Sequence, residues 1–266
     1  METPAEGPGG LAREPERRAG LAPVPERRPY AQPYDSLAFT VVSRAARELT
    51  ITLAAQPVFD LGRSAPVARR VRRTVRHAGG ERALRPGGRT LETGDLHRID
   101  ALTLREGLAM LRPGPSDSGI LPAYWRTVAS SRGRFARLCA ELQHARAPGS
   151  LLIEVVGGME QAPPGAVADV IGHFETAAQG VILHLAPDPA TVARAAGVGA
   201  RCLALDFAGV AHEHASDWRS AAELIAAARA ACGQVLLLNL RPDRGLAARS
   251  AGATHAVFAG MEPVLV

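Results

Sequence analysis

Lysine is absent from this sequence: all 31 basic residues of the 266-residue chain are arginine. Together with the abundant alanine, glycine and proline, this absence indicates a GC-rich coding bias, which requires no functional explanation. The formal charge of +5 would permit contact with an anionic partner, because clustered cations raise the local potential. The coding bias accounts for the charge equally well, so the charge alone assigns no partner.

Aromatic residues are also scarce, at 4% of the chain, and they are scattered. The stacking platforms that bind single-stranded nucleic acid are therefore missing, and we expect no nucleic acid partner. No uncharged apolar run of about 18 residues occurs, and charges interrupt the region where a signal peptide would be apolar. We expect a soluble cytoplasmic protein that does not enter the membrane.

Cysteine occurs only three times, at Cys139, Cys202 and Cys232. The number is odd, the three are far apart, and none belongs to a CxxC motif. This spacing is typical of reduced core thiols in a cytoplasmic protein and predicts neither a disulfide framework nor a metal site.

The remaining composition fits one large folded domain preceded by an arm. Apolar residues make up 47% of the chain, and the mean hydropathy is +0.00. Residues 1–34 are rich in Pro, Gly, Glu and Arg, which predicts a disordered arm. Residues 35–266 form the predicted domain. At its start, the spacing of Leu37, Val41, Val42 and Ala45 predicts a short amphipathic helix.

The domain then alternates apolar strand-like runs with amphipathic helical segments. Nearly continuous apolar strands indicate a sheet covered on both faces, and hence parallel strands with helical crossovers. No GxGxxG or GxxxxGK[ST] loop marks a Rossmann or P-loop fold, so periodicity leaves a barrel and a doubly wound sheet open. The clearest predicted strands are 151–156, 181–185, 202–206 and 235–240; the predicted helices are 166–178, 189–196 and 217–231.

Four segments in order carry a resemblance to a known family. The run 56–61 (QPVFDL) looks like a QPIxDL strand, and 94–100 (GDLHRID) leads into a helix that brings an aspartate. The runs 151–156 (LLIEVV) and 203–206 (LALD) resemble the LEITE and KID strands. Together they resemble EAL domains. The resemblance implies a TIM-like (β/α) barrel of the EAL type, with a site at the carboxyl ends of its strands.

Active EAL enzymes hydrolyse cyclic di-GMP with two divalent cations, which require carboxylate and amide oxygens. The resemblance places Arg69 or Arg70 where the family has its signature glutamate. The family's NLS asparagine would fall within 120–125 (ILPAYW), which offers no side-chain amide. An arginine at the position of the signature glutamate would repel a metal ion.

Further ligands are missing along the rest of the chain. Gly157 stands at the second glutamate of LEITE, and His184 and Leu185 replace the paired aspartates. Ala204 stands at the lysine of KID, and Arg241 replaces the last glutamate of the pattern. Carboxylates remain at only two positions of the family site, Glu154 and Asp206. Both are expected to pair with arginine rather than with a metal ion, because an unpaired buried charge is costly.

The leading interpretation is therefore a catalytically inactive EAL-like regulatory or scaffold domain in bacterial signalling, with no cofactor and with an unidentified protein partner. A metal-free cyclic di-GMP receptor is the first alternative, in which Arg69, Arg70 and Arg241 are the candidate phosphate-binding residues. An active cyclic di-GMP phosphodiesterase or another barrel enzyme is the second alternative. A homodimer stays open.

Three further features receive a structural interpretation. His184 at a strand end is predicted to be a hydrogen-bonded core histidine, and the segment His212–His214 to be a solvated loop rather than a metal site. The arginine-rich run 69–89 is interpreted as a solvated linker, with phosphate binding as the alternative.

Overall fold

The computed structural model describes residues 36–80, 82–84, 91–111, 118–144, 150–208 and 215–260. The predicted disordered arm, residues 1–34, lies outside the described residues, as does the segment His212–His214. All described residues belong to one unit, Gln32–Val266. None of the described helices has the length and apolar character needed to cross a membrane.

The chain forms nine strands and seven α-helices within these described ranges. The strands are β1 (Ser36–Val42), β2 (Glu48–Asp60), β3 (Ala65–His77), β4 (Ser118–Tyr124), β5 (Leu151–Val156), β6 (Gly180–Leu185), β7 (Cys202–Asp206), β8 (Val235–Leu240) and β9 (His255–Phe258). The helices are α1 (Thr93–Met110), α2 (Trp125–Ser130), α3 (Arg134–His144), α4 (Pro164–Gly172), α5 (Pro189–Arg194), α6 (Ala215–Cys232), α7 (Gly245–Ser250) and the 3-10 helix η1 (Pro242–Arg244).

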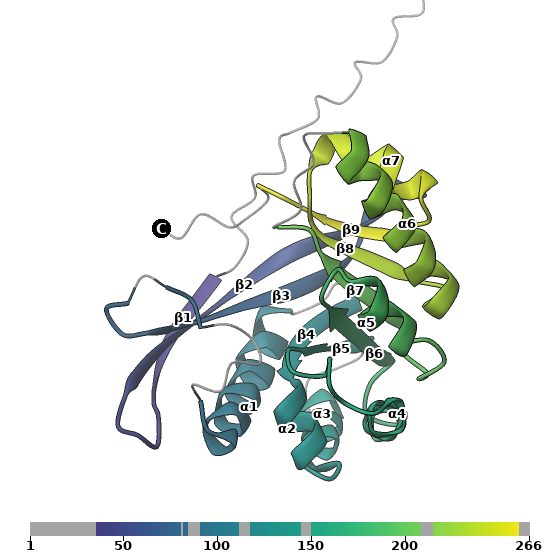
Figure 1. The fold of residues 1–266 in the computed structure, drawn as a ribbon. Helices are drawn as coiled ribbons and strands as arrows, with labels where there is room; N and C mark the ends of the chain where they lie inside the picture. Colours follow the sequence, from purple (N-terminus) through teal and green to yellow (C-terminus); the bar gives the residue numbers. More distant parts are fainter. Residues whose placement is uncertain are drawn as a thin grey trace, which may run out of the picture. The chain divides into compact units, whose positions relative to one another are not determined.

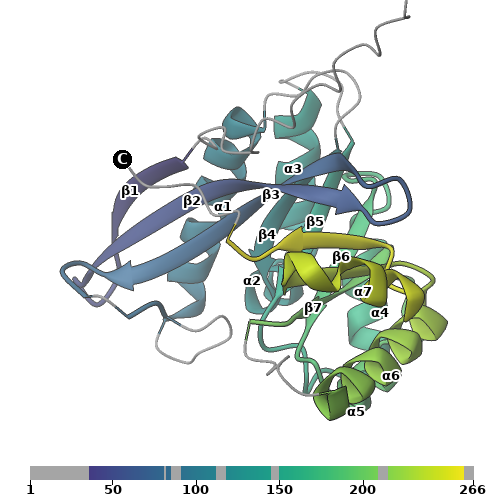
Figure 2. The same ribbon diagram turned by 90° about the horizontal axis from the view of Figure 1, so that it is seen from above.

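Strands β2 to β9 follow one another around a closed barrel, because β2 pairs both with β3 and with β9. The strands from β3 to β9 run parallel to one another, and the helices lie on the outer side of the sheet (Figures 1 and 2). The predicted TIM-like barrel is confirmed, and the four predicted strands match β5, β6, β7 and β8 to within one residue.

The expectation that all barrel strands are parallel is wrong for β2, which runs antiparallel to both of its barrel neighbours. A tight turn, Leu61–Ser64, joins β2 to β3. The Oδ1 atom of Asp60 accepts hydrogen bonds from the backbone nitrogens of Gly62 (2.7 Å) and Arg63 (2.9 Å). Such an Asx turn reverses the chain, and a connection this short permits only antiparallel pairing.

The helix predicted at the start of the domain is also wrong, because residues 36–42 form strand β1, paired antiparallel with β2. Leu37, Phe39 and Val41 alternate toward the core, whereas Val42 is 54% exposed. Leu37 and Val41 fit both a helix and a strand, whereas the inward position of Phe39 and the outward position of Val42 fit the strand period. Beyond the barrel, β1, β2 and β3 continue as an antiparallel sheet (Figure 1).

Two apolar cores stabilise the barrel. The larger one fills the space between the outer face of the sheet and the helices. The smaller one fills the barrel interior, and its members come from alternate positions along the strands, as the two-residue period of a strand requires. The interior core consists of Val58, Ala68, Ile120, Ile182, Cys202, Ala204, Leu236, Leu238 and Val257. Polar interior residues therefore stand out, and they gather above this core.

Candidate functional site

A cavity of about 340 Å³ opens at the carboxyl ends of the parallel strands, and we call it the mouth cavity. Tyr124, Val156 and Asp206 line it, and each is the last residue of its strand. His184 and Asn239, next to last in β6 and β8, line it as well. Parallel barrels place ligand and catalytic sites at this end, so the mouth cavity is the candidate site.

An ion pair between Arg70 and Glu154 lies at the base of the mouth cavity. The Nε atom of Arg70 donates to Oε2 of Glu154 (2.6 Å), and Nη2 donates to Oε1 (2.8 Å). The Nη1 atom of Arg70 donates to Oε1 of Gln56 (3.1 Å). Both carboxylate oxygens therefore face the same guanidinium in a bidentate arrangement, the strong form of this interaction.

His184 completes this network, because its Nδ1 atom lies 2.8 Å from Oε1 of Glu154. Glu154 is fully buried. Burial acts to raise the pKa of Glu154, but the positive charge of Arg70 and the hydrogen bonds from His184 and Arg70 lower it to about 2. An ionised carboxylate only accepts hydrogen bonds, so Nδ1 of His184 carries a proton. In the neutral ring Nε2 is then the acceptor.

Asp206, the second surviving carboxylate, is held separately on β7. Its Oδ1 atom accepts hydrogen bonds from Nδ2 of Asn239 (2.6 Å) and from the backbone nitrogen of Ala208 (2.9 Å). Asn239 has a φ angle of +55°, in the left-handed region that asparagine tolerates better than most residues. The β8–β9 register shifts between Leu237 and Leu240, so a local irregularity directs this amide to Asp206.

Arg72 also lines the mouth cavity, two residues beyond Arg70 on the same strand. Burial is the main cause that lowers the pKa of Arg72, and the charge of Arg70 adds to it, while the negative charge of Asp206 acts in the opposite direction. The negative charge of Asp206 thus partly offsets the effect of the Arg70 charge on Arg72.

A third cation in the lining, Arg73, forms a buried pair with a carboxylate on α1. Its Nη1 atom contacts Oδ1 of Asp100 (2.5 Å) and Oγ1 of Thr103 (3.1 Å). The guanidinium lies 3.9 Å from the centre of the Tyr124 ring, a cation–π contact. Oδ2 of Asp100 accepts a hydrogen bond from the backbone nitrogen of Tyr124 (3.0 Å). Asp100 belongs to the helix-borne aspartate segment of the resemblance.

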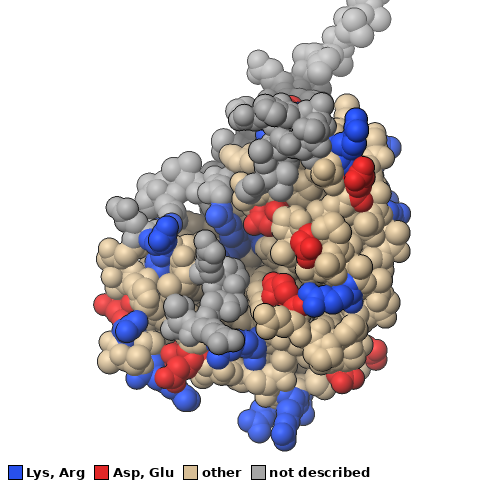
Figure 3. All heavy atoms as spheres, viewed as in Figure 1, with Lys and Arg blue, Asp and Glu red and all other residues tan. Residues whose placement is uncertain are grey.

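The arginines of the lining are therefore each matched by a carboxylate: Arg70 by Glu154, Arg73 by Asp100, and Arg72 by the field of Asp206. The charges in and next to the mouth cavity are therefore balanced. On the face drawn in Figure 3, basic and acidic side chains are likewise interspersed.

Of the five residues that the sequence predicted for the site, Arg70 and Glu154 are in direct contact, and Asp206 lies in the lining of the same cavity. Arg69 is not among the lining residues: the strand period turns it away from Arg70, and its Nη1 atom donates to the carbonyl oxygen of Met110 (3.3 Å). Arg69 therefore lies outside the lining of the mouth cavity.

Arg241 follows β8 but is exposed and does not line the cavity. Its guanidinium forms a bidentate pair with Asp243, with Nε–Oδ1 and Nη2–Oδ2 both at 3.0 Å. Arg72 belongs to the run 69–89, for which the sequence predicts a solvated linker with phosphate binding as the alternative; residues 69–77 lie in strand β3 instead, and strand alternation from Arg70 brings Arg72 to the cavity. The role of Asn239 has no signal in the sequence.

The residues present do not fit the two-cation centre of the EAL pattern. In the described part of the chain, no group of three or more His, Cys, Asp or Glu side chains is placed to hold a metal ion. Glu154 has an arginine against both oxygens, and Asp206 is bound by an amide. A divalent cation would have to displace a guanidinium that is already in contact with the carboxylate.

Comparison with known proteins gives a structural match only. No protein-family model matches the sequence, and no curated protein sequence matches it. An EAL domain protein from Listeria monocytogenes superposes with a TM-score of 0.56 at 12% identity over 78% of this chain and 85% of that one.

Two further structures with similar folds contain the nucleotide. The Bacillus subtilis YkuI protein, with an EAL domain and in complex with c-di-GMP and calcium, has a TM-score of 0.59 at 12% identity over 77% of this chain and 53% of that one. The Xanthomonas citri FimX EAL domain, in complex with c-di-GMP, has a TM-score of 0.56 at 13% identity over 78% and 85%. The chain has the barrel fold of EAL domains.

Proposed function

We propose that this chain is a catalytically inactive EAL-like domain that acts as a regulatory or scaffold module in bacterial signalling, through contact with a protein partner. The Arg70–Glu154 ion pair is the observation that carries the proposal. The resemblance places Arg69 or Arg70 at the signature glutamate, and of these two Arg70 lines the mouth cavity. It places Glu154 at the first glutamate of LEITE. Two positions that supply metal ligands in the active pattern are here bound to each other.

The chemistry of this ion pair opposes metal-dependent hydrolysis. The guanidinium supplies the positive charge next to Glu154, but it has no open coordination position on which to activate a water molecule. His184, in place of a paired aspartate, donates to the same carboxylate rather than bridging two cations. The network thus replaces the charge of a metal centre without its reactivity.

Metal titration tests this replacement independently of any substrate. Millimolar Mg²⁺ or Mn²⁺ is expected to leave the thermal unfolding midpoint unchanged, because a cation with no site does not stabilise the folded state. A saturable rise in the midpoint that disappears in Glu154→Gln would overturn the proposed loss of the centre. Affinity capture from a bacterial lysate then tests for a specific protein partner. The Arg241→Gln protein, which differs at one exposed residue, is the parallel control.

A metal-free receptor for cyclic di-GMP is the second candidate, and the lining of the mouth cavity is the observation that favours it. Arg72, His184 and Asn239 bring a guanidinium, an imidazole and an amide to one cavity of about 340 Å³, a size within the range of ligand pockets. Arg72 takes the place of Arg69 and Arg241 as the phosphate-binding candidate.

Calorimetric titration with cyclic di-GMP in EDTA tests the receptor. Arg72→Gln should weaken binding by about tenfold or more, whereas Arg241→Gln, on the rim, should leave the affinity unchanged. No binding at tens of micromolar nucleotide would eliminate the receptor and leave the scaffold proposal in place.

A further inference from the structure

A second hollow, of about 860 Å³, lies at the amino ends of β6, β7 and β8. It is therefore at the end of the barrel opposite the mouth cavity, and the apolar interior core lies between the two. We call it the basal hollow. Three polar residues in its lining, Gln179, Arg201 and Gln234, each come directly before one of these strands.

The backbone places these three residues on neighbouring strands with a stagger: Arg201 is level with Val181, two residues beyond Gln179, and Gln234 is level with Cys202. The backbone nitrogen of Gln179 donates to the carbonyl oxygen of Leu151 (2.7 Å), and that of Arg201 donates to the carbonyl oxygen of Val181 (2.8 Å). The carbonyl oxygen of Gln234 accepts from the next strand, β7. Neighbouring strands lie about 4.8 Å apart, so the three side chains form a slanted row that steps by one or two residues from strand to strand.

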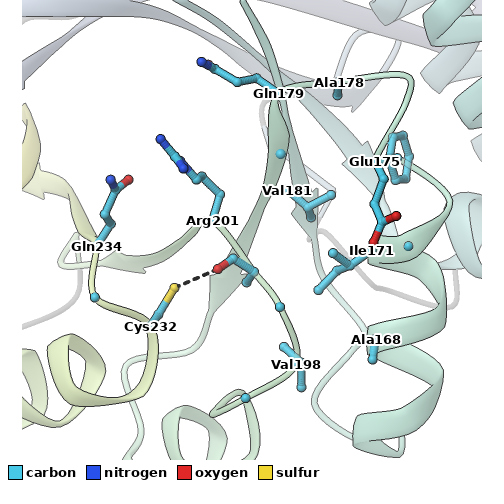
Figure 4. Close-up of a pocket in the computed structure, with 17 residues that line it drawn as sticks. Ala168, Ile171, Glu175, Ala178, Gln179, Val181, Val198, Arg201, Cys232 and Gln234 are labelled. Carbon is cyan, nitrogen blue, oxygen red and sulfur yellow. Dashed lines mark hydrogen bonds between the residues drawn. The ribbon is translucent and has the colours of Figure 1, made fainter.

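Arg201 is the middle member of the row, because β7 lies between β6 and β8. Figure 4 shows its side chain between those of Gln179 and Gln234, with all three directed to the same side of the close-up and Glu175 on the other side. A planar guanidinium is thus flanked by two carboxamides.

Gly180 makes room for the stem of Arg201. A Cβ atom at position 180 would lie 2.8 Å from Cβ of Arg201 and 3.2 Å from its Cγ, closer than side chains tolerate. On the other side, Sγ of Cys232 donates to the carbonyl oxygen of Ala200 (3.1 Å; Figure 4). The segment that carries Arg201 is thereby tied to the end of α6.

The donors of the row are not used inside the protein. Within the described part of the chain, the side chains of Gln179, Arg201 and Gln234 make no hydrogen bond or ion pair. A guanidinium and two carboxamides together offer up to about nine N–H donors. Glu175 is the acidic residue of the lining, and it forms no ion pair with a described residue.

We propose that the basal hollow binds the oxyanion of a small molecule, a phosphoryl or carboxylate group, on Arg201 with Gln179 and Gln234 as flanking donors. Arginine binds both groups in a bidentate manner through its planar fork, and amides at each side complete the coordination of the remaining oxygens. This site is separate from the mouth cavity and does not depend on the function proposed for it.

Nuclear magnetic resonance of the side-chain nitrogens of the intact chain tests the site at constant ionic strength. Inorganic phosphate, and acetate in a parallel titration, distinguish a phosphoryl from a carboxylate ligand. The Arg201 Nε–H signal and the Gln179 and Gln234 amide signals are expected to shift saturably with at least one of the two anions. Arg201→Gln should weaken that binding by about tenfold or more.

Two other variants make the result specific. Gly180→Ala retains every donor but displaces the aliphatic part of the Arg201 side chain, so it should also weaken anion binding. If Arg201→Gln fails to fold, Gly180→Ala provides the test instead. Arg219→Gln on α6 removes an exposed arginine elsewhere and should change nothing. Linear, unsaturated shifts with both anions, or equal affinity in Arg201→Gln and the unmodified chain, would overturn the proposal.

Discussion

Arg70 and Glu154 contact each other through two hydrogen bonds of 2.6 and 2.8 Å in the interior of the barrel. The pair joins β3 to β5 across β4, and both side chains are almost completely buried. A buried pair of this kind is a weak source of net stability, but the removal of one partner leaves an uncompensated charge.

Arg70→Met should therefore lower the free energy of unfolding by about 3–5 kcal/mol. The double variant Arg70→Met with Glu154→Met removes both charges and should recover most of this loss. Chemical denaturation measures both. Arg241→Met breaks the exposed pair with Asp243 and, as the control, should cost less than about 1 kcal/mol. A similar small loss for Arg70→Met would contradict a buried ion pair.

Acid should destabilise the protein through Glu154. The pKa of this carboxyl is lowered from 4.5 to about 2 in the folded state. A lowered pKa contributes stability that is fully present above pH 4.5 and is lost as the pH falls toward 2, about 3 kcal/mol in total. Urea denaturation across this range should show a shallower loss in Glu154→Gln than in the unmodified chain. Parallel pH profiles for the two proteins would refute the assignment.

The sequence predicts the repeated βα units well, because the strands β5 to β8 are short, apolar and separated by amphipathic helices. The prediction from the sequence fails where apolar residues fit both the helix and the strand period, as for Leu37 and Val41. It also fails where a turn decides the direction of a strand, as after Asp60. At the site, resemblance narrows the signature position to Arg69 or Arg70, and the two-residue strand period then selects Arg70. The contact of Asn239 with Asp206 cannot be predicted from the sequence, since it depends on a register shift.

The backbone and the amide of Asn239 make separable contributions to the site. Asn239→Gly keeps the left-handed conformation but loses the hydrogen bond to Asp206, which should cost about 1–2 kcal/mol. Asn239→Ala adds the strain of a φ angle near +55°, a further cost of about 1–2 kcal/mol. Denaturation curves of the two variants should differ by that increment. Equal stability would show that the backbone relaxes.

His184 should be found with its proton on Nδ1, because its partner there is an ionised carboxylate. Nitrogen-15 shifts of the ring at a pH where it is neutral report the tautomer directly. In Glu154→Gln this preference should weaken, since a carboxamide oxygen is a poorer acceptor than a carboxylate. A ring protonated on Nε2 in the unmodified chain would contradict the geometry of the network.

The proposed loss of phosphodiesterase activity can be measured in a turnover assay. Purified protein is incubated with cyclic di-GMP and millimolar Mg²⁺ or Mn²⁺, and the linear dinucleotide is quantified by chromatography over several hours. The Arg70–Glu154 pair predicts no product above that of a protein-free control. Metal-dependent formation of the linear dinucleotide, in proportion to protein concentration and abolished by Glu154→Gln, would show that the domain is an active phosphodiesterase.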